Sequence, residues 1–96
     1  MKYSFHPDAE EEFNHAIHYY HDCRKGLGYE FVVEVYLAIE RARAYPKAWH
    51  IIEGDIRRSL VNKFPFGILY SEEGNELFII AVMHLHKKPD YWKKRN

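Results

Sequence analysis

The sequence contains one cysteine, and its formal net charge at pH 7 is zero. The lone Cys23 excludes an internal disulfide and suits a reducing compartment. No apolar run approaches the roughly 20 residues that a membrane helix needs, and residues 1–5 lack the apolar region of a signal peptide. These absences predict a cytoplasmic protein that makes no membrane contact.

Glycine and proline are also sparse, at five and four residues, and no linker, internal repeat or low-complexity tract interrupts the chain. Apolar residues make up 47% and aromatic residues 17% of the 96 positions. That content is sufficient for one hydrophobic core, and the length leaves no room for a second. We therefore expect a single domain over residues 1–96.

The zero net charge conceals an uneven distribution between the two halves. Residues 1–53 carry six Lys/Arg and nine Asp/Glu, whereas residues 54–96 carry eight and five. The basic half could face phosphate groups while the acidic half faces a partner of different charge, although a solvated surface can show the same asymmetry.

The order of the predicted elements is strand, two helices and three strands. Proline at position 7, followed by acidic residues, favours a helix start, because negative charge stabilises the positive end of the helix dipole. Residues 48–55 give only a weak signal. The predicted ranges are 2–5 for the first strand, 7–24 and about 29–44 for the helices, and 56–63, 66–71 and 76–84 for the later strands.

Each predicted helix has one apolar face at helical spacing. The sequence therefore predicts an α+β sandwich, in which an N-terminal strand and a helix hairpin precede a three-stranded antiparallel meander and a short basic C-terminal tail. Both helices should cover one face of the sheet and leave the other open. The two faces consist of Ala9, Phe13, Ala16, Ile17 and Tyr20, and of Phe31, Val35, Ala38, Ile39 and Ala42.

The chemistry-bearing side chains gather in the basic half. Imidazoles titrate near neutral pH, lysines neutralise phosphate charge, and aromatic rings stack on unpaired bases. RNA cleavage without a metal needs a general base, a general acid and cations at the phosphate, so we expect no cofactor and no metal. The candidate catalytic residues are His84, His86, Lys87 and Tyr91, and the candidate RNA-binding residues are Arg57, Arg58, Lys63, Lys88 and Trp92. Alternatively, the tail is only a basic, frayed end, with Tyr91 and Trp92 capping the core.

Two segments in this half carry a family resemblance: F-P-F-G-I-L-Y at residues 64–70 and L-F-I-I-A-V-M-H-L-H-K-K-P-D-Y-W at residues 77–92. With the helix hairpin and the chain length, they resemble the RelE/ParE superfamily of bacterial toxins from type II toxin-antitoxin systems. The resemblance covers nearly the whole chain. It implies a growth-inhibiting toxin that a cognate antitoxin wraps and holds inactive.

The resemblance leaves the target open. RelE-type members enter the ribosomal A site and cut messenger RNA, whereas ParE-type members inhibit DNA gyrase without a catalytic site. The long hairpin and Gly67, which stands about where many ribosome-dependent nucleases have an arginine, favour the second type. Lys87 and Lys88 could compensate for that arginine, so the residues favour messenger RNA cleavage on the ribosome by a small margin. A degenerate, non-toxic binding module is a further alternative.

Histidines recur every three residues at His15, His18 and His21, close to Cys23. Each step of three residues falls about 60° short of a full turn of a helix, so His15 and His21 diverge by about 120° and we predict no metal site there. His84 and His86 could share one side of an extended segment with Asp90 near them. A metal site at that point is only a minor alternative.

Overall fold

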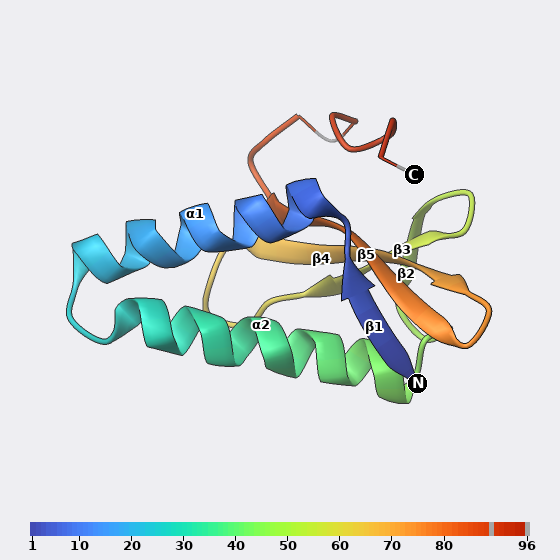
Figure 1. Cartoon of the computed structure of the whole chain (residues 1–96), viewed down its shortest axis with the longest axis horizontal. Helices are drawn as coiled ribbons and strands as arrows, with labels where there is room; N and C mark the ends of the chain where they lie inside the picture. The colour runs from blue at the N-terminus through green and yellow to red at the C-terminus, as the bar shows by residue number, and fades with distance from the viewer. Residues whose placement is uncertain (89, 96) are drawn as a thin grey trace.

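The structure is a computed structural model, which describes residues 1–88 and 90–95. Two helices lie side by side along one face of a twisted sheet, and the C-terminal segment crosses to the other side (Figure 1). The elements are β1 (Lys2–Phe5), α1 (Pro7–Cys23), α2 (Leu27–Ala44), β2 (His50–Glu53), β3 (Ile56–Leu60), β4 (Phe66–Glu73) and β5 (Glu76–His84). The predicted α+β class and the helix hairpin are confirmed.

The sheet contains five strands in the order β1-β5-β4-β3-β2. β1 pairs in parallel with β5, and every other neighbouring pair is antiparallel. The predicted three-stranded meander is therefore incomplete, because β2 precedes it as a fourth antiparallel strand. Gly54, at φ +56°, makes the turn that joins β2 to β3. The sequence signal for β2 is weak because Ile51 is exposed while Ile52 is half-buried, so the strand lacks a clean alternation.

Both helices pack through the predicted faces. Pro7 is in the first turn of α1, and the His6 imidazole caps it by accepting a 3.0 Å hydrogen bond from the amide of Asp8. Ala9, Phe13 and Ala16 are buried in α1, and all five predicted residues of α2 are buried. Amphipathic spacing was sufficient to orient both helices.

The helices approach closely at Gly28, near the start of α2. A β-carbon at this position would lie 2.9 Å from the carbonyl oxygen of Ile17 and 3.1 Å from the β-carbon of His21. Backbone and a stiff β-carbon cannot move aside as a flexible side chain can, so the crossing of the hairpin requires glycine at this point.

The main core lies between the helices and the sheet. Phe31 of α2 is fully buried at its centre, with ring centroids of Tyr20, Phe64 and Phe66 at 5.1, 5.1 and 5.0 Å. The contacts with Phe64 and Phe66 are edge-to-face, and such contacts add to the free energy of burying the rings. The aromatic cluster fixes the distal end of the hairpin against the ends of β3 and β4.

The second face of the sheet is not open as predicted. It carries its own apolar cluster, in which Trp92 of the C-terminal segment packs against the sheet with only 3% of its surface exposed. The other buried members of this cluster are Leu69, Ile80, Ala81 and Met83. The basic tail thus supplies part of the fold.

Within residues 1–88 and 90–95, neither α1 nor α2 combines the length and the apolar content that a membrane-spanning helix needs.

We predict that Gly28→Ala destabilises the protein by about 1–3 kcal/mol, because the clash with α1 outweighs the better helix propensity of alanine. Tyr29→Ala is the matched control, since Tyr29 is 75% exposed on the next residue of the same helix. Urea unfolding of both variants measures the difference. A Gly28→Ala variant as stable as the Tyr29→Ala control would contradict the close approach.

Candidate functional site

The C-terminal segment reverses direction immediately after β5. The amide of Leu85 donates to the carbonyl of Pro65 at 2.9 Å, and the amide of Lys87 donates to the carbonyl of His84 at 3.1 Å. The segment then returns along β5 and places Trp92 on the second face. Its indole is buried there, as the alternative role of a cap on the core predicts, and only 3% of its surface is exposed for contact with RNA.

A carboxylate–guanidinium pair holds the returning segment. Arg95 donates to both carboxylate oxygens of Glu12 on α1, with Nη1–Oε1 at 2.8 Å and Nη2–Oε2 at 3.0 Å. Both side chains are largely buried, so the pair has the strong bidentate geometry of a partly desolvated ion pair. The acidic start of α1 therefore anchors the basic end of the chain.

This pair also completes the edge of β5. The register of β1 on β5 ends at Ile79, so the backbone of the following residues lies beyond the cover of β1. Glu12 accepts a hydrogen bond from the amide of Val82 at 3.1 Å, and Arg95 donates to the carbonyl of Ile80 at 3.3 Å. The two side chains satisfy backbone groups that a neighbouring strand would otherwise satisfy.

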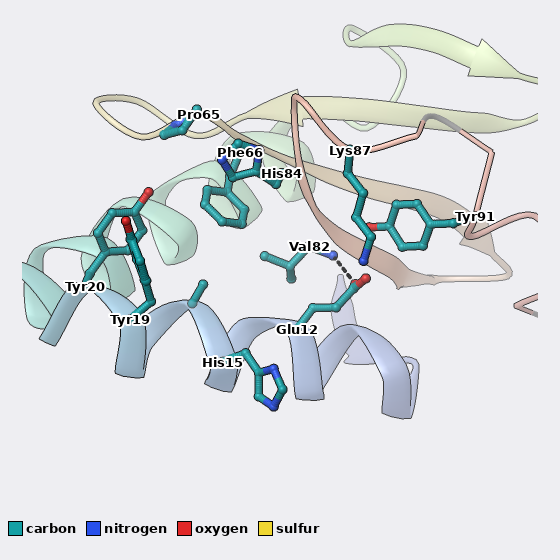
Figure 2. A pocket seen from close by; sticks show the side chains of 11 residues that line it. Glu12, His15, Tyr19, Tyr20, Pro65, Phe66, Val82, His84, Lys87 and Tyr91 are labelled. Carbon is teal, nitrogen blue, oxygen red and sulfur yellow. Dashed lines mark hydrogen bonds between the residues drawn. The ribbon is translucent and has the colours of Figure 1, made fainter. Parts of the chain in front are cut away.

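A groove of about 600 Å³ lies between α1 and the ends of β4 and β5. Figure 2 shows Tyr19 and Tyr20 rising from α1 on one side, Lys87 descending from the tail on the other, and Phe66 and His84 between them. The ring of His15 lies at the rim and points away from the middle of the groove. The lining residues are Glu12, His15, Ala16, Tyr19, Tyr20, Pro65, Phe66, Val82, His84, Lys87 and Tyr91.

Of the two predicted catalytic histidines, His84 lines this groove and His86 lies next to His84 without lining it. Their ring centroids are 5.3 Å apart, and His84 packs edge-on against Phe66 at 5.0 Å. The Nδ1 atom of His84 accepts a 3.1 Å hydrogen bond from the amide of His86, which leaves the proton of a neutral ring on Nε2. His84 is thus arranged to donate a hydrogen bond, while the exposed ring of His86 can accept a proton.

Lys87 and Tyr91 lie on the tail side of the groove. The Lys87 ammonium is 4.4 Å from the centroid of the Tyr91 ring, and the guanidinium carbon of Arg95 is 4.9 Å from it. Through these cation–π contacts the Tyr91 ring packs against two positive charges. Lys87 itself is exposed, so its charge remains available to a phosphate in the groove.

The hydroxyl group of Tyr91 is less suited to the predicted catalytic role. It is buried and has no hydrogen-bond partner among residues 1–88 and 90–95. Burial, and secondly the negative charge of Glu12, raise the pKa of Tyr91 above its ordinary value. A buried hydroxyl with a raised pKa gives up its proton less readily, so the structure favours a packing role for the Tyr91 ring.

Arg58 lies on the opposite face of the sheet from the groove. Its aliphatic stem lies over Gly67, where an added β-carbon would approach the Cδ and Cγ atoms of Arg58 to 2.8 and 2.9 Å. The side chain of Arg58 therefore fills the space that a residue larger than glycine would need at position 67. The sequence could not show this, because the pairing of β3 with β4 decides it.

The other predicted RNA contacts are dispersed. Arg57 donates to the carbonyl of Trp49 at 2.8 Å, and Lys63 lies 3.6 Å from the carboxylate of the buried Glu34. Lys88 is exposed beyond the histidines. Of the predicted RNA-binding set, Lys88 and Trp92 are next in the chain to the groove residues Lys87 and Tyr91, but the Trp92 indole is buried on the second face. Both arginines and Lys63 lie outside the groove lining.

Sequence reasoning missed the contribution of α1. Tyr20 was assigned to packing, Glu12 to the helix dipole, and Tyr19 to no role, yet all three line the groove. The sequence did contain a signal for Tyr19, because this large aromatic side chain lies outside the predicted apolar face that includes Tyr20. In the structure Tyr19 is 64% exposed. Within the described ranges, no group of three or more His, Cys, Asp or Glu side chains is placed to hold a metal ion.

No protein-family model matches this chain, and no curated protein matches it. The RelE/ParE resemblance therefore stays a prediction from the residues quoted above.

We predict that Glu12→Gln and Arg95→Gln each lower the free energy of unfolding by about 1–3 kcal/mol, and that the double variant loses much less than the sum. Each single change leaves a largely buried charge without its partner. Urea unfolding of the four proteins in the cycle gives the coupling energy.

The pair Lys93–Glu53, at 3.0 Å and exposed on both sides, is the matched control in the same segment. Its cycle should give a coupling near zero, since solvent screens exposed pairs. Equal coupling energies in the two cycles would contradict a special role for Glu12 and Arg95.

We predict that Tyr91→Phe leaves stability at pH 7 unchanged or raises it slightly, because the change removes a buried hydroxyl without a hydrogen bond. The raised pKa adds a pH dependence. Above about pH 10 the unfolded tyrosine loses its proton while the folded one keeps it, so the wild type loses stability that the variant retains. Urea unfolding at pH 7 and at about pH 11, with Tyr29→Phe as control, measures both effects. A large loss of stability of Tyr91→Phe at pH 7 would contradict the conclusion that the hydroxyl makes no stabilising hydrogen bond.

Proposed function

We propose that this protein is a growth-inhibiting toxin of the RelE/ParE type that acts on messenger RNA at the ribosome, in the cytoplasm, under the control of a cognate antitoxin. The observation that supports the proposal best is the juxtaposition of His84, His86 and Lys87 with an aromatic groove. His84 and Lys87 line the groove, and the ring of His86 lies 5.3 Å from that of His84.

The groove offers what a single-stranded RNA segment needs. Tyr19 and Tyr20 present rings on which an unpaired base can stack, and Lys87 supplies positive charge for the phosphate. Cleavage then requires removal of the 2′-hydroxyl proton as the 2′-oxygen attacks phosphorus, and protonation of the 5′-oxygen as its bond to phosphorus breaks. In this proposal His86 is the base, Nε2 of His84 donates a hydrogen bond to a phosphate oxygen, and the Lys87 ammonium protonates the departing 5′-oxygen.

A second candidate has its own supporting observation. The residues predicted for catalysis and RNA binding are divided, since the hydroxyl of the predicted catalytic Tyr91 is buried and the predicted RNA-binding Arg58 lies on the other face. The helices expose Tyr29, Tyr36 and Leu37, which suit a binding surface. A gyrase-directed inhibitor that binds without catalysis fits these facts, and so does a non-toxic module that only binds an antitoxin.

Pulse labelling after induction separates these functions. The full chain is expressed in bacteria, and incorporation of labelled amino acid and of labelled thymidine is followed over the first minutes. Messenger RNA cleavage predicts that protein synthesis fails first. Earlier failure of DNA synthesis would favour the gyrase reading, and unimpaired growth at confirmed expression would favour the binding module.

We predict that His86→Ala and Lys87→Gln each reduce the inhibition of protein synthesis by about 100-fold or more, as loss of a proton acceptor or of phosphate stabilisation requires. His18→Ala is the matched control, because His18 is exposed on α1 and does not line the groove. Full toxicity of both site variants, at equal protein levels, would exclude catalysis by these residues.

A further inference from the structure

A second cavity lies at the opposite edge of the sheet from the groove. The pairing of β2 with β3 begins at His50 and Arg58, so Leu60 extends beyond the cover of β2. A pocket of about 410 Å³ opens at this step. Its lining consists of Arg41, Trp49, His50, Arg58, Leu60 and Asn62.

The lining has an unusual charge balance for a protein whose net charge is zero. It includes two guanidinium groups, one imidazole and one carboxamide, and none of these six residues carries a carboxylate. The groove on the other side, by contrast, contains the carboxylate of Glu12. Charge complementarity therefore favours an anion in the edge pocket.

The walls of the pocket are held before any ligand arrives. Arg41 donates to the carbonyl of Leu60 at 3.0 Å, and the indole nitrogen of Trp49 donates to the carbonyl of Arg41 at 3.2 Å. The guanidinium of Arg57 holds the carbonyl of Trp49 at 2.8 Å. Fixed walls reduce the entropy that binding would cost.

The side chain of Arg58 contains a buried hydrogen-bond donor that lacks a partner among the described residues. This donor is its Nε atom. Contact of its stem with the Gly67 position restricts where the guanidinium can lie. A buried donor without a partner is rare enough to require an explanation, and an oxygen-rich anion in the pocket would supply the acceptor.

We propose that this edge pocket binds the phosphate group of a nucleotide. Arg41 and Arg58 bind the phosphate oxygens, and the apolar surfaces of Trp49 and Leu60 contact the sugar or base. The volume lies within the range of small-molecule sites. The inference does not rest on RNA cleavage, because the pocket shares no residue with the groove. The nucleotide can be free or part of a strand, and the phosphate chemistry is the same.

The experiment uses the full chain, labelled with ¹⁵N and titrated with adenosine 5′-monophosphate, adenosine and a six-nucleotide single-stranded RNA. The indole signal of Trp49 reports on the pocket, and that of Trp92, buried on the second face, serves as an internal reference. We expect saturable shifts of Trp49 with the monophosphate and at least tenfold weaker binding of adenosine. Binding of the monophosphate assigns a free nucleotide, whereas binding of the RNA alone assigns a strand.

Arg58→Gln and His50→Ala should each weaken the bound ligand at least tenfold, while Arg24→Gln, an exposed arginine on the far side of the hairpin, should leave binding unchanged. His50 is exposed, so its replacement keeps the test valid if Arg58→Gln fails to fold. Absence of saturable shifts with both phosphate ligands, or equal weakening by Arg24→Gln, would overturn the proposal and leave these charges as protection of a sheet edge.

Discussion

The ion pair between Glu12 and Arg95 is the contact on which the arrangement of the site depends. It joins the first helix to the last described residue, 83 positions apart in the chain, and it satisfies the backbone of β5 where β1 ends. Removing either side chain would leave both a buried charge and open backbone groups. The position of the segment between β5 and Arg95, which carries Lys87 and Tyr91, follows from this anchor.

A second consequence concerns the faces of the sheet. With the helices on one face and Trp92 on the other, both apolar surfaces have a cover, and the chemically active side chains are left to the edges. The groove lies at the β5 side and the basic pocket at the β2 side. A chain of zero net charge can still attract phosphate locally, because its carboxylates and its arginines are distributed unevenly between these edges.

The sequence predicted the parts of the fold that short-range patterns control. The apolar faces of α1 and α2 and the bounds of β5 agree with the structure, since helical spacing and a continuous apolar strand are local signals. β2 was missed because its exposed Ile51 breaks the pattern. The surroundings of Trp92 and Arg58 could not be predicted for another reason. They depend on how the tail returns and on which residue of β4 pairs opposite, and neither is encoded in spacing along the chain.

The histidines and Lys87 were found from composition and position. The aromatic side of the groove, formed by Tyr19 and Tyr20 of α1, became visible only from the packing of the hairpin against β5.

The most direct test of the account is a map of messenger RNA 5′ ends in cells within minutes of induction, compared with cells that express His86→Ala. The account predicts new ends inside translated regions with the wild type and none with the variant. New ends that persist in the variant, or growth arrest by the wild type without new ends, would contradict it.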